Sequence, residues 1–302
     1  SRSFDNVFLV PSPRPAVELT VTLRDYHART MASMTHRVNP TDILIRRQHQ
    51  QSRYTTIHAA ADTARCIHVA FVAEGYTIGQ MDQYLADCRA ATEALFRHEP
   101  FKQLQDRFNI IAIQSPSHDT DVSQPGKNIW LDTALGSHFD TFYSTRYLTT
   151  LHLTRLHDLL AGTTYEHIII MANTAHYGGG GIYNSYNLCY TRGQQFLPVV
   201  VHEFGHSFGG LGDEYPYGDD DPMYFADTEP WEPNLTTHTT HPAKWQKLID
   251  EGRASLVEGG GYLTHGVWRG QEDCRMRTNE HPDFCPVCQE ALTRLIKFYT
   301  EK

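Results

Sequence analysis

Long apolar runs are missing from this sequence: none of its stretches approaches the ~20 apolar residues that a helix needs to cross a bilayer. Excess positive charge is missing too, because 26 Lys and Arg stand against 35 Asp and Glu, for a formal net charge of −9. Nucleic-acid phosphates are bound by clustered Lys and Arg. We therefore expect no transmembrane segment and no nucleic-acid partner. Nor does any internal repeat or low-complexity tract stand out.

One segment carries most of the chemical information. Residues 202–215 read HEFGHSFGGLGDEY, directly after the apolar run 197–201. If this segment is a helix, His202 and His206 lie one turn apart on one face, with Glu203 between them in sequence. Zinc binds neutral imidazole nitrogens, and a catalytic zinc site normally has three protein ligands. The segment therefore predicts a zinc site that includes both histidines and one further ligand.

The residues after the helix offer two candidates for that third ligand. A glycine-rich run at 209–212 can turn the chain back toward the histidines. Asp213 and Glu214 follow at once, and each has a carboxylate that zinc accepts. The pattern HExxHxxG resembles the metzincin signature, but a metzincin third ligand would fall at Gly212, which has no side chain. We predict Asp213 as the ligand, with Glu214 as the alternative, because spacing alone does not separate them.

Besides HEFGHSFGGLGDEY, the chain contains FVAEGYT at 71–77, EPF at 99–101, FNI at 108–110, HYGGGG at 176–181 and CRMR at 274–277. Through these segments it resembles the M64 family, the IgA-peptidase-like group of bacterial secreted zinc metallopeptidases, over roughly residues 65–300. This resemblance implies an α/β, metzincin-like zinc peptidase domain with a mixed sheet and helices. It also implies that Met276 is the methionine of a turn beneath the zinc.

Alternation of apolar and polar residues within 15–47 predicts β-strands near the N-terminus. The polar stretch 46–53 is typical of a linker. We therefore expect a short β-rich segment at 1–50. The family resemblance implies that this segment is the closing part of an N-terminal β domain and that 51–302 is a zinc metallopeptidase catalytic domain. The sequence begins at Ser1 without an initiator methionine or signal peptide, from which we expect a processed or truncated chain.

Strand and helix patterns alternate through the second part, as in an α/β fold. A long irregular region rich in Gly, Pro, Asp and Thr follows the histidine helix. The expected strands are 66–73, 108–113 and 167–172, and the expected helices are 80–97, 139–160, about 196–208 and about 287–299.

Six cysteines would allow up to three disulfides. We expect one between Cys274 and either Cys285 or Cys288, which would join the floor of the metal site to the last helix. A structural zinc would need four ligands, so these three cysteines would require one more. A thioredoxin-like redox role for the pair at 285–288 is a further alternative. A secreted, cell-surface or periplasmic location in bacteria is expected mainly from the family resemblance.

The expected activity is that of a zinc-dependent metalloendopeptidase acting on protein or peptide substrates, with Glu203 as the general base for a zinc-bound water. The family resemblance implies that the segment HYGGGGIYNSY at 176–186 forms an edge strand above the cleft, with a flexible surface turn as the alternative. Tyr183 and Tyr186 are possible oxyanion donors, but spacing selects neither. The alternatives are a zinc-containing surface binding or adhesion protein and an amidase acting on cell-wall material. Oligomeric state stays open.

Overall fold

A computed structural model of the protein describes residues 13–25, 27–45, 52–217, 224, 227–241 and 243–301. The chain divides into two units, residues 1–49 and 50–302. In the first unit, β1 (Val17–Arg24) and β2 (Thr30–Val38) form an antiparallel hairpin in which Val17 pairs with Val38. Apolar and polar residues alternate along β1, as expected for a strand. Most of the linker predicted at 46–53 lies outside the described residues.

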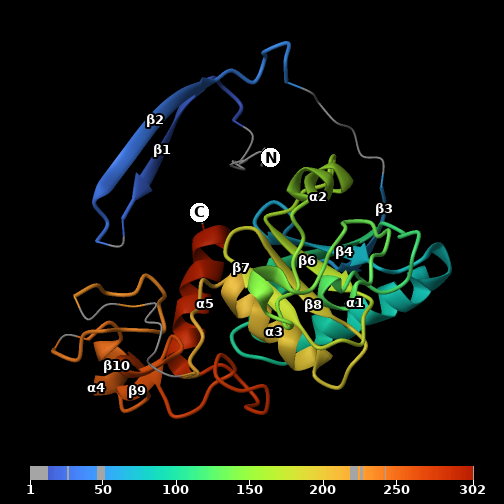
Figure 1. The fold of residues 1–302 in the computed structure, drawn as a ribbon. Helices are drawn as coiled ribbons and strands as arrows, with labels where there is room; N and C mark the ends of the chain where they lie inside the picture. The colour runs from blue at the N-terminus through green and yellow to red at the C-terminus, as the bar shows by residue number, and fades with distance from the viewer. Residues whose placement is uncertain are drawn as a thin grey trace. The chain divides into compact units, whose positions relative to one another are not determined.

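A six-stranded mixed sheet forms the centre of the second unit (Figure 1). Its spatial order is β3-β5-β4-β6-β8-β7, with β3 and β7 antiparallel to their neighbours and the other four strands parallel. The central strands are almost wholly buried, because helices or loops cover both faces of the sheet. The strands are β3 (Arg53–His58), β4 (Ile67–Glu74), β5 (Phe108–Gln114), β6 (His167–Ala172), β7 (Gly179–Ile182) and β8 (Tyr186–Tyr190).

Three helices pack on one face of the sheet, and a shorter helix lies on the other (Figure 1). The first face carries α1 (Met81–Leu95), α3 (Phe196–Ser207) and α5 (Pro286–Thr300). The opposite face carries α2 (Leu153–Leu159) and the long loop that precedes it. Alternate residues of β4 feed the two cores, with Phe71 in one and Val72 in the other. The predicted α/β class with a mixed sheet is confirmed, as are the three predicted strands and three of the four predicted helices.

The helix predicted at 139–160 is wrong. The chain from 139 to 152 is a loop that contains the 3-10 turn η4 (Thr141–Tyr143), and only α2 is α-helical. Left-handed backbone at Asp140 and Phe142 interrupts the helix. Hydroxyl side chains compete with helical hydrogen bonds here, since Thr150 Oγ1 donates to Leu135 O at 2.7 Å. The buried Glu74 carboxylate fixes the segment just before this loop by accepting three hydrogen bonds from residues 133–137.

The region between α3 and α5 has little regular structure, as its composition predicted. It contains α4 (Gln246–Asp250) and a hairpin of β9 (Val257–Gly260) and β10 (Leu263–Arg269). The hairpin turn holds the chain that follows α3, because Gly261 N donates to Asp213 O at 2.7 Å and Tyr217 N donates to Tyr262 O at 2.8 Å. Among the described residues, no helix has the length and apolar character to cross a membrane.

Candidate active site

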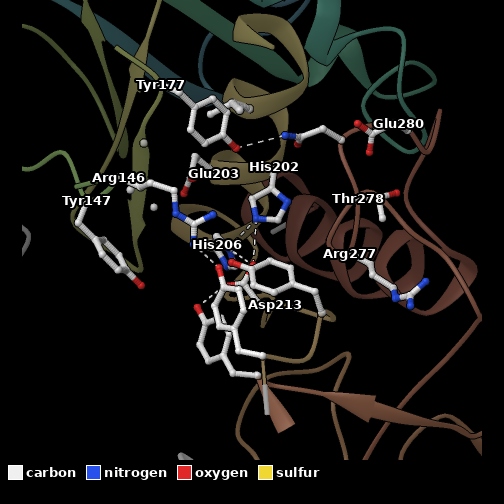
Figure 2. A pocket seen from close by; sticks show the side chains of 18 of the residues that line it. Arg146, Tyr147, Tyr177, His202, Glu203, His206, Asp213, Arg277, Thr278 and Glu280 are labelled. Atoms are coloured by element: carbon white, nitrogen blue, oxygen red, sulfur yellow. Dashed lines mark hydrogen bonds and ion pairs between the residues drawn. The ribbon is translucent and has the colours of Figure 1, made fainter. Parts of the chain in front are cut away.

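Helix α3 places three of the predicted site residues at one end of a pocket (Figure 2). Its apolar residues, among them Val201 and Phe204, are buried against the sheet, which turns the polar face of its last turns outward. The His202 and His206 rings lie one helical turn apart, with centroids separated by 4.8 Å. Glu203 lines the same pocket.

A glycine turn brings the third predicted residue to the histidines. Gly210 has a φ of +61°, and its N–H donates to His206 O at 3.0 Å, so the helix ends in a left-handed cap. The chain then reverses, and Asp213 Oδ1 lies 3.0 Å from His202 Nε2 and 3.1 Å from His206 Nε2. Of the two carboxylates that the sequence left open, Asp213 is the one that faces the histidines. Glu214 points away, toward three cysteines.

The outer hydrogen bonds of both imidazoles orient them for metal binding. His202 Nδ1 donates to Arg275 O at 2.8 Å, and His206 Nδ1 donates to Leu211 O at 2.6 Å. Each Nε2 is therefore directed toward Asp213, with the two Nε2 atoms 3.1 Å apart. Zinc ligands at 2.0–2.1 Å in a tetrahedron are separated by about 3.3 Å. Three donor atoms 3.0–3.1 Å apart fit such an ion, and the set could hold one.

The charges in this cluster favour a bound proton or metal ion. Burial alone would raise the pKa of Asp213, but the His206 and His202 imidazoles hold it well below its usual range. Burial lowers the pKa of His206, yet the Asp213 carboxylate outweighs burial and raises that pKa to about 9. Two imidazole nitrogens and a carboxylate oxygen at this spacing repel one another unless a proton or a metal ion lies between them.

Glu203 lies beside this cluster and lines the same pocket. Burial raises its pKa, while the charges of His202 and His206 lower it in part. The Glu203 carboxylate lies against the backbone of Gly181 in β7, because a Cβ added at Gly181 would come within 3.1 Å of Glu203 Oε2. A side chain at Gly181 would clash with the carbonyl oxygen of Glu203 and would lie 2.7 Å from His206 Cβ. The glycine run of β7 thus allows the strand to touch α3, a purpose that the sequence did not reveal.

Two residues that sequence analysis missed hold Asp213 in place. Asn234, fully buried, accepts from Gly212 N at 2.8 Å and donates to Gly212 O and to Glu214 Oε1 at 2.9 and 2.8 Å. Tyr262 OH donates to Asp213 Oδ2, which leaves Oδ1 for the histidines. Both residues come from distant loops, and no local pattern in the sequence marks them.

The pocket around this cluster has a volume of about 510 Å³. Tyrosines form much of its wall, including Tyr217 and Tyr262, whose rings stack at 5.4 Å. The tyrosines considered from the sequence are not among the lining residues: Tyr183 packs on Trp231, and Tyr186 OH bonds to Thr150. The residues that line the pocket are Arg146, Tyr147, Tyr177, Gly179, Gly180, Gly181, Val199, His202, Glu203, His206, Asp213, Tyr215, Pro216, Tyr217, Tyr262, Arg277, Thr278, Asn279 and Glu280.

Strand β7 lies at the edge of the sheet, as expected for the segment 176–186. The outer side of this edge is partly occupied, because Tyr147 forms an isolated parallel bridge with Gly179. A peptide that added to the edge would therefore meet the segment containing Tyr147 first.

Met276 lies directly beneath α3. A Cβ added at Gly205 would come within 2.6 Å of Met276 Sδ, so helix and methionine are in close contact. Two backbone carbonyls in this loop hold the site residues in place. Arg275 O accepts a hydrogen bond from His202, and Met276 O accepts one from Glu214 N at 2.8 Å.

The predicted disulfide is not formed. Cys274 Sγ and Cys285 Sγ lie 3.7 and 3.6 Å from Cys288 Sγ, whereas a disulfide needs about 2.05 Å. The three cysteines do come together, as expected, but all are free thiols.

A family model described as IgA Peptidase M64 matches residues 55–257, about two thirds of the chain. The matched segment contains His202, Glu203, His206 and Asp213, and it ends before Met276 and the three clustered cysteines. No curated protein matches the chain.

Proposed function

Because the chain belongs to the IgA Peptidase M64 family of peptidases, we propose that it is a zinc-dependent metalloendopeptidase with His202, His206 and Asp213 as metal ligands. The observation that carries this proposal is the triangle of Nε2, Nε2 and Oδ1 atoms at 3.0–3.1 Å, with each Nδ1 bonded to a backbone carbonyl. Two nitrogen ligands and one carboxylate are the donor set of many catalytic zinc sites. When bound, zinc supplies a Lewis acid that polarises the scissile carbonyl and acidifies water.

Glu203 is the general base in this proposal. Its carboxylate takes a proton from the attacking water and returns it to the leaving amine nitrogen as the peptide bond breaks. The raised pKa brings its basicity nearer to neutral pH, and the close approach of the β7 backbone at Gly179 and Gly181 restricts the position of the carboxylate. Held by Tyr262 and by the hydrogen bonds of Asn234 to its neighbours, Asp213 keeps its position while Glu203 exchanges the proton.

A metzincin-like arrangement of the domain is part of the proposal. Its support is Met276 beneath the histidine helix and the edge strand β7 beside Glu203. The departure from that class is the ligand set, because a carboxylate at Asp213 takes the place of a third histidine.

We propose protein or peptide substrates and export from a bacterial cell to its surface, periplasm or surroundings. Tyrosine side chains and the charged residues Arg146, Arg277 and Glu280 offer both stacking and polar contacts to an extended peptide. Export is supported by the family alone, and recovery of the chain only from the cytosol of its natural host would refute it.

Cleavage of a fluorogenic peptide library, before and after chelation, tests the activity. We expect cleavage by the metal-loaded protein, loss after chelation, and recovery when zinc is added back. Cleavage that persists in protein shown to be free of metal would refute zinc dependence.

Cell-wall fragments serve as a second substrate panel. Release of amide-linked groups from these fragments, without peptide library cleavage, would replace the endopeptidase proposal with an amidase. Metal-loaded protein that turns over neither panel would favour a surface binding protein.

A further inference from the structure

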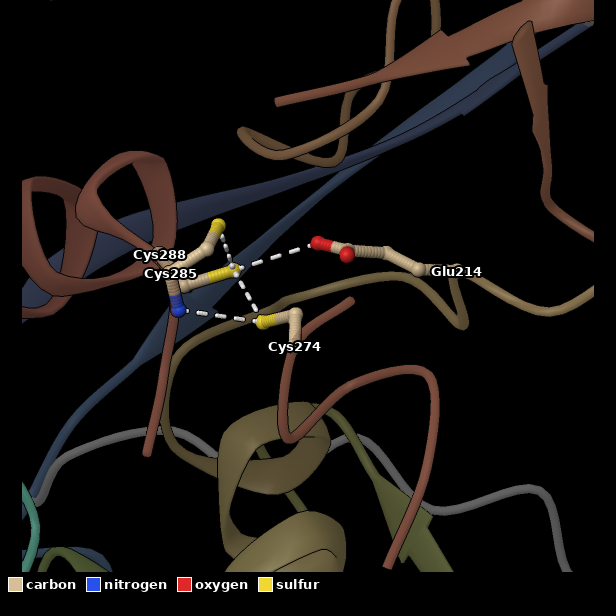
Figure 3. Close-up of side chains that lie close together, drawn as sticks. All are labelled: Glu214, Cys274, Cys285 and Cys288. Carbon is tan, nitrogen blue, oxygen red and sulfur yellow. Dashed lines mark hydrogen bonds between the residues drawn. The ribbon is translucent and has the colours of Figure 1, made fainter. Parts of the chain in front are cut away.

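The structure contains a second cluster of potential metal ligands, separate from His202, His206 and Asp213 (Figure 3). It consists of Glu214, Cys274, Cys285 and Cys288, and one ligand atom from each lies within 4.8 Å of the others. All four side chains are buried, with exposed fractions of 0 to 1%. They come from three segments: the turn after α3, the loop containing Met276, and the start of α5.

The spacing of these atoms matches a tetrahedral zinc site. Zn–S bonds of about 2.3 Å place two sulfurs about 3.8 Å apart in a tetrahedron. The two printed Sγ–Sγ separations, from Cys288 to Cys274 and to Cys285, are 3.7 and 3.6 Å. Glu214 Oε1 lies 3.3 Å from Cys288 Sγ, near the roughly 3.5 Å expected between an oxygen and a sulfur ligand.

Hydrogen bonding in the cluster is incomplete without a further partner. Glu214 Oε2 is buried and has no hydrogen-bond partner among the described residues. Such a carboxylate oxygen is costly to bury. Cys285 N donates to Cys274 Sγ at 3.1 Å, so the backbone at the start of α5 holds this sulfur in the cluster. Arg269 and Arg275 are buried nearby, and their charges act on Glu214 and on Cys274.

Redox chemistry does not account for this cluster. A redox pair must be reached by a partner thiol or disulfide. Cys285 is 1% exposed and Cys288 is fully buried, so neither sulfur is accessible from the surface of the folded chain. The fourth residue is a carboxylate, which has no part in disulfide exchange but is a zinc ligand.

We propose that Glu214, Cys274, Cys285 and Cys288 bind a second zinc ion with a structural role. Four protein ligands fill the coordination sphere, as in other structural zinc sites. Three thiolates and a carboxylate carry four negative charges, and a bound divalent ion neutralises two of them. The site does not depend on the catalytic proposal, because the two clusters share no ligand.

The second zinc ion would fix the floor of the pocket. Glu214 is the neighbour of Asp213, and Cys274 precedes Arg275, whose carbonyl accepts the hydrogen bond from His202. Binding one ion thus connects the Asp213 turn and the Arg275 loop to the first turn of α5. Adjacent carboxylates, Asp213 and Glu214, serve two different ions on opposite sides of one segment.

Zinc content and X-ray absorption on three forms of the full chain test this proposal. We expect two zinc ions in wild type, one in His202→Ala/His206→Ala, and one in Cys274→Ser/Cys288→Ser. Zinc in the histidine variant should show Zn–S distances of about 2.3 Å. Cys88→Ser is the matched control, because Cys88 is a buried free cysteine on α1 outside the cluster, and this variant should keep both ions.

Wild-type protein gives a measurement that needs no variant to fold. Its absorption spectrum should contain three sulfur ligands for every two zinc ions, and all six cysteines should titrate as thiols after denaturation without reductant. A wild-type spectrum without Zn–S scattering would overturn the proposal, and so would a disulfide within the cluster. If only the catalytic proposal fails, wild type and the histidine variant will have equal zinc content and identical Zn–S scattering.

Discussion

Replacing Asn234 with alanine should weaken both the fold and the metal site. Three hydrogen bonds of 2.8–2.9 Å join its side chain to Gly212 and Glu214, the two neighbours of Asp213. Each bond is worth about 1 kcal/mol, and each buried group left unpaired costs about 1–3 kcal/mol. Partial relaxation of the turn reduces the sum, so we expect the free energy of unfolding to fall by about 3–5 kcal/mol. Metal affinity should fall by about 10–100-fold, as for other residues that orient ligands.

Urea unfolding and competition with a chelator measure these two effects separately. Asn173→Ala is a matched control, because Asn173 is a buried asparagine that donates to Gly75 O at 2.9 Å and accepts from Arg192 at 2.6 Å, away from the pocket. We expect it to lose stability without losing metal affinity. If Asn234→Ala behaves like this control, Asn234 does not position Asp213.

Three further predictions follow from the geometry around the sheet. Gly181→Ala should lower peptide turnover, because the added Cβ meets the Glu203 carbonyl, whereas Gly79→Ala, with open space at its Cβ, should leave turnover unchanged in the same assay. Burial lowers the pKa of His167 from 6.5 to about 4. Between these two pH values the imidazole is protonated in the unfolded chain but not in the folded chain. The free energy of unfolding should therefore fall by about 3 kcal/mol in total as the pH falls through this window. In His167→Leu, the midpoint of urea unfolding should depend less on pH than in wild type. Glu74→Gln should lower the free energy of unfolding by about 2–4 kcal/mol. The carboxylate accepts three hydrogen bonds of 2.7 Å, and the NH₂ group of glutamine would place a donor against one of these donors. An unchanged melting temperature would contradict this.

Apolar patterns predicted the strands that are buried on both faces of the sheet and the helix that packs on one of its faces. The strands at 66–73, 108–113 and 167–172 and the helix at 80–97 lie within two residues of the observed bounds. At 139–160 apolar residues recur as in a helix. The preceding residues 133–137, however, donate tertiary hydrogen bonds to the Glu74 carboxylate, which holds the chain in another path. That carboxylate lies more than 50 residues earlier in the chain, so no window along the sequence contains the competing interaction.

Spacing along the chain predicted the two histidines of the candidate site but did not decide between Asp213 and Glu214. Successive side chains in a non-helical segment point to opposite sides, so only one of Asp213 and Glu214 could face the histidines. Which one does so depends on Asn234 and on Tyr262 in the hairpin turn, and both contacts are distant in sequence. Sequence analysis also did not predict Glu214 as the fourth member of the cysteine cluster. The fold alone brings Glu214 to Cys274, Cys285 and Cys288, which lie 60 or more residues later in the chain.

Turnover and metal content of Glu203→Gln, compared with wild type, test the central claim most directly. The amide keeps the size of the side chain but cannot accept the water proton. We predict unchanged zinc content in both proteins and a loss of peptide turnover of about 10²–10⁴-fold in the variant. A variant that binds zinc and cleaves peptides as fast as wild type would contradict the assignment of Glu203 as the general base.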